Sequence, residues 1–162
     1  MSSTAQFVLA GLCTVMTCGV MLGGTQAPWE TVVRPGELIQ TDGPPIRFPA
    51  ERTVRNAGST FYAGPAPLLA TLALLASIGA LIAGGVVRIA LYVVVVAGAV
   101  WVLGLATQTV VYDGPAGIEH SFGPGQAITV GGAVGTLLGA MTALLVGRAV
   151  PRLRMPESAP ND

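Results

Sequence analysis

Residues 126–147 read QAITVGGAVGTLLGAMTALLVG, and this stretch decides the fold. It carries no charged side chain. Its length of roughly twenty residues is what an α-helix needs to cross the hydrocarbon core of a bilayer. Three further apolar stretches, over 5–24, 65–87 and 89–111, have similar length and composition. The sequence therefore predicts an all-α membrane protein, a bundle of four transmembrane helices.

Small residues recur at every fourth position of this last stretch, at Gly131, Gly135, Gly139, Ala143 and Gly147. Residues four apart lie on one face of a helix, and small residues there let two backbones approach closely in lipid. The ladder therefore predicts a helix-packing face, suited to a right-handed crossing. An Ala- and Gly-rich span also meets this spacing by chance, and the ladder alone does not say which helix it contacts.

The composition independently favours a membrane protein. The chain of 162 residues is 52% hydrophobic and only 10% charged, whereas soluble domains carry about a quarter charged residues. The formal net charge is zero, so no basic surface is available to neutralise phosphates, and a nucleic-acid partner is not expected. All basic residues are Arg, which together with the high Ala and Gly content is typical of a high-GC bacterial genome.

The first apolar stretch is predicted to be a retained transmembrane helix and not a cleaved leader. Residues 1–6 lack the basic side chain that a signal peptide needs, and Thr-Gln-Ala at 25–27 is a poor cleavage site. Cys13 and Cys18 lie about 140° apart on such a helix, so they cannot easily pair with each other. We expect both to be buried free thiols.

The long polar loop over 25–64 carries aromatic residues beside both neighbouring spans. Trp29 follows the first span, and Phe61 and Tyr62 precede the second, where aromatic rings anchor at the membrane interface. Between them, WETVV and ELIQT flank a Pro-Gly turn and predict a small β-hairpin, with an irregular loop as the alternative. Residues 46–48 are a candidate third strand.

The second span repeats the small-residue spacing at Ala76, Ala80 and Gly84, which makes it a natural mate for the fourth. Gly84-Gly85 and Arg88 separate it from the third span. Because this connection is very short, the second and third spans must form an antiparallel helical hairpin.

The distribution of basic residues predicts the orientation, because Arg in short segments beside the spans favours the cytoplasm. One side of the membrane receives Arg88 and the arginines that follow the last span. The other side receives the loops over 25–64 and 112–125. The first loop has as many acidic residues as arginines, and the second has acidic residues but no arginine. We therefore expect a multi-pass protein of the inner (plasma) membrane with both termini cytoplasmic, a membrane domain over 1–150 and a cytoplasmic tail over 151–162.

Residues suited to catalysis or to metal binding are few. Asp113, Glu119 and His120 share the second polar loop, but they fall short of a zinc-ligand pattern and are expected to be solvated. The predicted spans contain no Asp, Glu, Arg or His, which disfavours an ion pump or a proton-coupled transporter. We expect no cofactor, no metal and no enzymatic activity.

The layout resembles claudin-type four-helix proteins in architecture only, since the first loop has one Trp and no cysteine. The whole chain is more similar to small four-span accessory membrane proteins of actinobacteria. Two such families stay open: the tryptophan-operon-associated membrane proteins, which also have a Trp soon after the first span, and the LucB-like small subunit of the mycobacterial Mce lipid importer. No motif decides between them, and neither resemblance transfers site residues.

Three functions are compatible with this reading. The preferred one is a non-catalytic accessory subunit that docks onto a larger membrane protein complex, with the Mce-type lipid-importer permease implied by resemblance. The second is a small transporter or pore that acts by self-association. The third, a lipid-modifying enzyme using Asp113, Glu119 and His120, has the least support.

Overall fold

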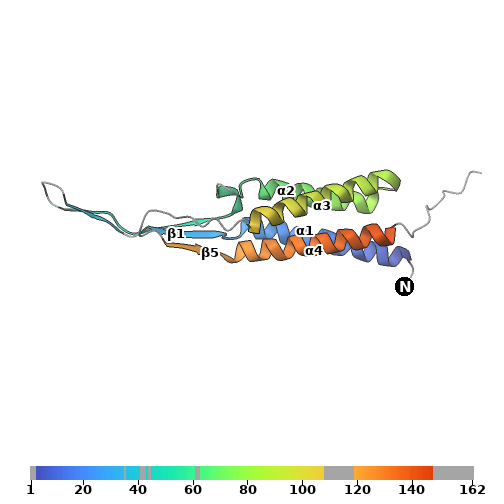
Figure 1. The fold of residues 1–162 in the computed structure, drawn as a ribbon, viewed down its shortest axis with the longest axis horizontal. Helices are drawn as coiled ribbons and strands as arrows, with labels where there is room; N and C mark the ends of the chain where they lie inside the picture. The colour runs from blue at the N-terminus through green and yellow to red at the C-terminus, as the bar shows by residue number, and fades with distance from the viewer. Residues whose placement is uncertain are drawn as a thin grey trace, which may run out of the picture.

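The computed structural model describes residues 3–34, 36–40, 43, 45–60, 63–107 and 119–147. Four helices lie side by side in an elongated bundle, and a narrow β-ribbon projects from one end of it (Figure 1). The N-terminus lies at the other end of the bundle (Figure 1). The helices are α1 (Ser3–Gln26), α2 (Ala66–Ile82), α3 (Gly85–Thr107) and α4 (Pro124–Gly147).

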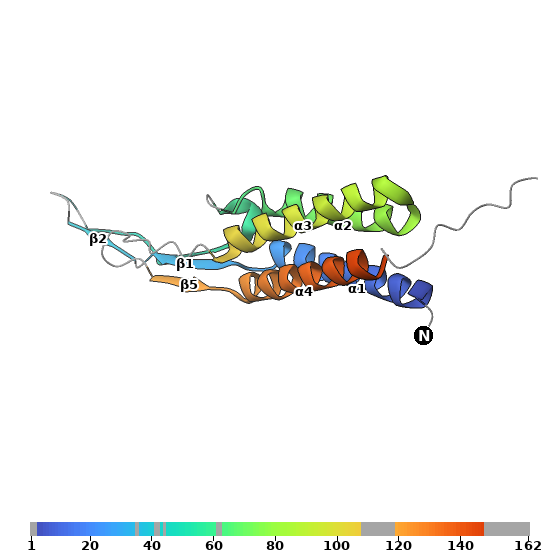
Figure 2. The same cartoon turned by 45° about the vertical axis from the view of Figure 1, so that its right-hand side comes forward.

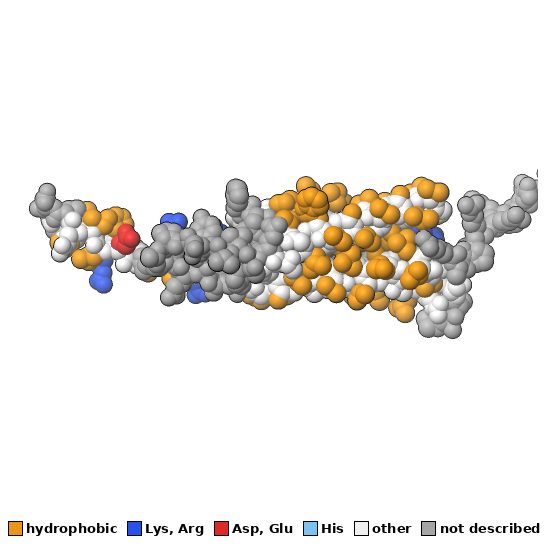
Figure 3. All heavy atoms as spheres, in the orientation of Figure 1, with side chains coloured by type: hydrophobic (Ala, Val, Ile, Leu, Met, Phe, Trp, Pro, Cys, Tyr) orange, Lys and Arg blue, Asp and Glu red, His pale blue; other side chains and the backbone are white. Residues whose placement is uncertain are grey.

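The helices form a closed ring in which α1 contacts α4 and α2, and α3 contacts α2 and α4 (Figures 1 and 2). Small side chains dominate the interior, including Ala70, Ala73, Ala99 and Ala140, all fully buried. Large apolar side chains point outward and cover the bundle surface, as Figure 3 shows. This inside-out distribution is what a bilayer allows, because lipid solvates Leu and Val while small residues let helices approach.

Three of the helices, α1, α3 and α4, are long and apolar enough to cross a membrane. The fourth, α2, is equally apolar but has 17 residues, about 25 Å of helix. The span predicted over 65–87 is therefore too long, and the third helix begins four residues before the predicted 89. The reason is Gly85, which has a φ of +60°, a conformation that glycine adopts readily. It lets the chain turn after Ala83 and Gly84, so that α3 begins at residue 85.

The early start of α3 places Arg88 within its first turn. The charge therefore belongs to a helix, although the sequence assigned it to the connection. The predicted helical hairpin is confirmed, because α2 and α3 pack against each other along the bundle.

The polar segments form a three-stranded and a two-stranded sheet, which follow one another along the ribbon (Figure 1). Strand β1 (Glu30–Arg34) lies between β4 (Glu51–Arg55) and β5 (Glu119–Phe122), and β2 (Leu38–Ile39) pairs with β3 (Ile46–Arg47). All pairings are antiparallel. The strand expected at 46–48 is present. The hairpin predicted between WETVV and ELIQT is wrong, because β1 and β2 run in the same direction along one side of the ribbon.

The ribbon keeps a single register from its base to its far end. Partners step residue for residue from Glu30↔Arg55 to Ile39↔Ile46, with Phe48 N–H donating to Glu37 O at 2.8 Å between the two paired segments. Ile39 and Ile46 are the last described pair of this register. Gly36 therefore lies within one side of the ribbon, between β1 and β2.

Candidate functional site

The helix-packing ladder predicted on α4 is only partly a packing face. Ala143 is buried, Gly135 and Gly139 lie against α1, and Gly147 faces the ring of Phe7. Gly131 instead lies on the outer surface, with nothing within 4 Å of where its Cβ would be. A four-residue step overshoots the helical repeat by about 40° each time, so the ends of the ladder diverge.

The helix that faces the ladder is α1, and the prediction that α2 is its mate is wrong. Contacts of α4 run along α1 and α3. Ala76 and Ala80 of α2 are buried in the bundle core, whereas Gly84 has nothing within 4 Å of a Cβ position. Small residues on α2 therefore serve its packing on α1 and α3.

The closest approach of two helices is what we call the α1–α4 seam, formed by Gly24, Met21, Thr17 and Thr14 of α1 against Thr129, Gly132, Gly135 and Gly139 of α4. A Cβ on Gly132 would lie 2.6 Å from the Cα of Met21. A Cβ on Gly24 would lie 2.6 Å from the backbone nitrogen of Thr129. Both helices thus contribute glycine, and backbone packs on backbone.

Hydroxyl groups line the same seam and are satisfied within their own helices. Thr14 donates to Ala10 O, Thr129 to Gly125 O and Thr136 to Gly132 O, each at 2.8 Å. Thr136 also lies 3.3 Å from the hydroxyl of Thr17 and 3.6 Å from the thiol of Cys18. These bonds add specificity to the packing, and none of them prepares a nucleophile.

The two cysteines differ in environment. Cys18 is fully buried beside Thr136, but Cys13 is exposed on the outer surface of α1. The expectation of two buried thiols is therefore wrong for Cys13. The angular separation on the helix is the reason, because only one of the two positions can face the bundle interior.

Trp29 connects the sheet to the bundle. Its side chain is fully buried among Ala57, Ala63, Ala66 and Ala106, and its indole N–H donates to Gly24 O at 2.9 Å. That carbonyl belongs to the last turn of α1, where helical partners run out. Trp29, which the sequence predicts to be an interface anchor, has its side chain buried in the protein at the end of the bundle. Phe61 and Tyr62 lie outside the described residues.

The backbone of the same tryptophan joins two strands. Its N–H donates to Arg55 O at 2.8 Å, and its carbonyl accepts from Gly123 N–H at 2.7 Å. A side chain at Gly123 or Gly125 would collide with the backbone between residues 24 and 28. The glycines before and after Pro124 therefore allow β5 and α4 to pass close to the end of α1.

The opposite end of the bundle is held by Arg88. Its Nε donates to Ala83 O at 2.8 Å, and its guanidinium lies 4.4 Å from the centroid of the Phe7 ring. A positive charge at the C-terminus of a helix, here α2, is favoured by the helix dipole, and the Phe7 ring adds a cation–π contact. One residue of α3 thereby links the end of α2 to α1.

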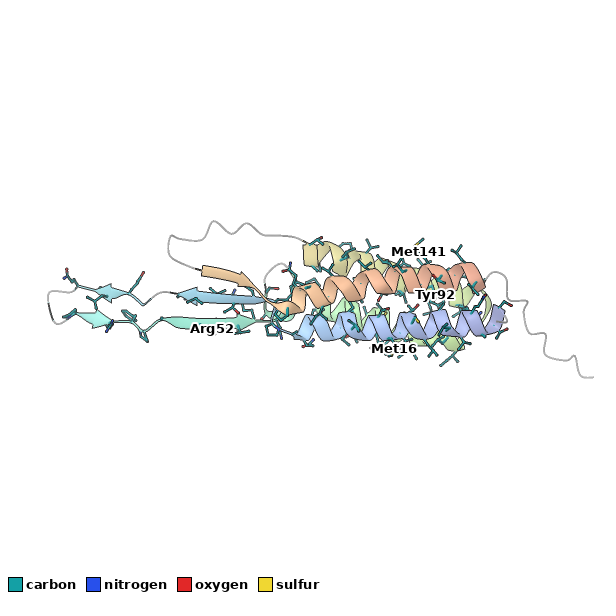
Figure 4. All side chains as sticks on the ribbon, turned by 90° about the horizontal axis from the view of Figure 1, so that it is seen from below. Met16, Arg52, Tyr92 and Met141 are labelled. Atoms are coloured by element: carbon teal, nitrogen blue, oxygen red, sulfur yellow. The ribbon has the colours of Figure 1, made fainter. Side chains whose placement is uncertain are left out.

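Tyr92 is buried inside the bundle near this end, whereas Met16 and Met141 lie on its outer surface (Figure 4). Among the described residues, its hydroxyl is the one buried side-chain polar atom without a hydrogen-bond partner. The hydroxyl lies over Gly11, where a Cβ would be 3.3 Å from it.

The residues considered for chemistry do not form a described cluster. Glu119 and His120 lie in β5, opposite Val33 and Val32 of β1, and Asp113 falls outside the described residues. The loop expected over 112–125 thus contains a strand and the first residues of α4. Within the described part of the chain, no group of three or more His, Cys, Asp or Glu residues is placed to hold a metal ion.

Comparison with known protein families, with curated proteins and with solved structures finds no match for this chain.

Proposed function

We propose that the chain is a non-catalytic accessory subunit of the plasma membrane that docks onto a larger cell-envelope complex. It would cross the membrane four times, with α2 as the short second span, and both termini would lie in the cytoplasm. The β-ribbon would then stand in the extracytoplasmic space. The surface of α2 supports its inclusion as a span, because its large side chains, Leu68, Leu72, Leu75 and Ile82, point outward like those of the longer helices.

The observation that carries this proposal is the contrast between a tightly filled bundle and a projecting ribbon. Glycine on each side of the α1–α4 seam brings two backbones into contact, and the remaining interior is filled by Ala, Val and single large residues. Such a bundle is suited to anchoring. The part of the molecule offered to other molecules is the ribbon, where every described residue from 36 to 54 is exposed (Figure 1).

The partner complex that we propose is an Mce-type lipid importer, and its permease is the component to which a four-span subunit would bind within the membrane. This identification rests on the resemblance of the whole chain to the LucB-like small subunit of that importer.

A self-associating transporter or pore is the second candidate, and one observation favours it. Gly19 and Gly23 of α1 are exposed, and nothing lies within 4 Å of their Cβ positions. Small residues four apart on a lipid-facing surface are a common dimerisation face for membrane helices. A pore would then form between copies, because each bundle interior is filled.

The experiment that separates the two is affinity purification of the chromosomally tagged protein in mild detergent, followed by mass spectrometry. The accessory function predicts stoichiometric recovery of a larger complex whose members include an integral membrane permease. Recovery of the protein alone, as a homo-oligomer of defined size, would contradict it. Replacing Gly19 and Gly23 by Leu is the matched control: it should dissociate such a homo-oligomer but leave a heterologous complex intact.

A further inference from the structure

The far part of the ribbon, residues 36–40 and 45–50, is here called the distal ribbon. It has two strands, whereas the base of the ribbon has three. Every described residue in it is exposed, and four are large and apolar: Leu38 at 59%, Ile39 at 45%, Ile46 at 50% and Phe48 at 51%. Figure 3 shows these apolar side chains at the end of the molecule farthest from the bundle. Two strands without a packed face are marginally stable in water, so this surface is suited to being covered.

The apolar side chains are distributed over both faces of the distal ribbon. Directly opposed residues share a face, and neighbours along a strand alternate between faces. Ile39 and Ile46 are opposed, and Phe48 lies two residues from Ile46, so these three share one face. Leu38 and Arg47 are opposed on the other face. A flat partner surface would cover one face and leave the other in water.

The area available on one face argues against a second copy of this chain as the occupant. Three half-exposed side chains offer on the order of 300 Å². A stable interface buries about 800 Å² on each partner. Stacking the matching apolar faces of two ribbons falls well short of this area. A cleft that receives both faces and an edge of the ribbon would bury much more.

The charge of Arg47 indicates what such a cleft contains. At the base of the ribbon, opposite charges face each other in the pairs Glu30↔Arg55 and Arg34↔Glu51. Arg47 faces Leu38 instead. Its diagonal neighbours on the same face, Gly36 and Gln40, are uncharged. The nearest acid on this face, Glu51, lies four residues further along the strand and is paired with Arg34, so within the described residues of the distal ribbon no acidic side chain neighbours Arg47 on its face.

The edges of the distal ribbon supply the remaining recognition element. Neither β2 nor β3 has a second neighbour among the described residues. Their outward backbone N–H and C=O groups can thus pair with an added strand, a mode in which main-chain bonds give affinity and side-chain pockets give specificity.

From this combination, and resting on the proposed accessory function, we propose that the distal ribbon inserts into a cleft of a larger extracytoplasmic protein of the partner complex. That cleft adds a strand to one ribbon edge, receives Ile39, Ile46 and Phe48 in apolar pockets and presents a carboxylate to Arg47. The subunit then has a docking contact on the ribbon, outside the membrane, in addition to the contact with the permease within the membrane.

The test compares Ile46→Asp with Val54→Asp in the tagged, full-length protein. Both positions carry β-branched apolar side chains on the same face of the ribbon, at 50% and 54% exposure, but Val54 lies at the three-stranded base. We expect Ile46→Asp to lower recovery of the partner complex at least about tenfold, as loss of a central interface anchor does. Val54→Asp should leave recovery within about twofold. Unfolding temperatures of both variants equal to that of the wild-type protein in detergent would exclude a folding defect, and Arg47→Glu should repeat the loss because it would place a second carboxylate against that of the cleft.

Photo-crosslinking from position 39 identifies the occupant directly. A crosslink to an extracytoplasmic member of the complex recovered with the wild-type protein, abolished by Arg47→Glu, supports the proposal. A crosslink to a second copy of this chain or to lipid overturns it. If Ile46→Asp and Val54→Asp recover the complex equally, the distal ribbon is not the contact, although the accessory function stands. If the wild-type protein recovers no complex, the accessory function itself has failed, and this inference with it.

Discussion

Replacing Gly132 or its neighbour Gly131 by Ala provides a stringent test of the α1–α4 seam, because the two changes are chemically identical. At Gly132 the new Cβ would lie 2.6 Å from Met21 Cα and 2.9 Å from Met21 Cβ. Ordinary van der Waals contact begins at 3.4 Å. Helix α1 would therefore have to withdraw from 2.6 Å to at least 3.4 Å, carrying Thr17 and Gly24 away from their own partners.

The magnitude follows from what resists the movement. Overpacking a well-filled core costs about 1–3 kcal/mol when side chains can adjust. Here the obstacle is backbone, which has no rotamer to change, so we expect Gly132→Ala to reach about 3 kcal/mol. At Gly131 the added methyl meets open space, and replacing Gly by Ala within a helix gains about 0.5–1 kcal/mol. The two substitutions should thus move stability in opposite directions.

The assay is thermal unfolding of the purified variants in mild detergent, followed by the fraction that stays monodisperse on size-exclusion chromatography. Gly131→Ala should match or exceed the wild-type midpoint, and Gly132→Ala should fall clearly below it. If both variants unfold at the same temperature, α1 does not approach α4 through Gly132, and the packing described for the seam is wrong.

Three further predictions concern other parts of the molecule. Trp29→Phe keeps an aromatic ring at the end of the bundle but leaves Gly24 O without the indole N–H; we expect the free energy of unfolding to fall by about 1–3 kcal/mol, measured as a lower unfolding temperature, and an unchanged temperature would indicate that water replaces the bond. Arg88→Leu removes both the bond to Ala83 O and the contact with Phe7; it should destabilise by about 1–2 kcal/mol, with Arg88→Lys in between, and an equal effect of the two variants would argue against the guanidinium geometry. An apolar maleimide that partitions into the detergent micelle should modify Cys13, on the outer surface of α1, faster than the buried Cys18 in the folded protein; comparing Cys13→Ser with Cys18→Ser by mass spectrometry checks this, and faster labelling of Cys18 would contradict its burial.

The sequence predicted the helical segments well because apolar runs of span length have few alternatives. It failed where a local pattern competed with a tertiary one. The four-residue glycine ladder was visible, but the pattern that tracks the buried face is Gly125, Thr129, Gly132, Thr136, Ala140 and Ala143, with steps of four and three. This near-heptad spacing stays on one side of a helix. It was the signal that could have identified Gly132.

The ribbon was mispredicted for a similar reason. Pro35-Gly36 is a strong turn signal in isolation, yet its use as a turn would separate Glu30 from Arg55 and Arg34 from Glu51, the opposite-charge pairs of the observed register. The observed register, in which Ile39 lies opposite Ile46, keeps both pairs. Trp29 was misplaced because a tryptophan after a span is compatible with lipid and with a protein interior. Only the packing of Ala57, Ala63 and Ala66 around it distinguishes the two.

The position of β5 has a consequence for the order of folding. Strand β1 can pair with β4 as soon as the intervening residues have been synthesised, since the ribbon is a local hairpin. Its other edge is completed by β5, which follows α2 and α3 in the chain. The same late segment leads directly into α4, whose glycines complete the seam with α1. A chain interrupted before residue 119 would therefore leave one strand edge and one helix face uncovered together. Residues 119–147 supply both missing surfaces, so pairing of β5 with β1 brings the start of α4 to the end of α1.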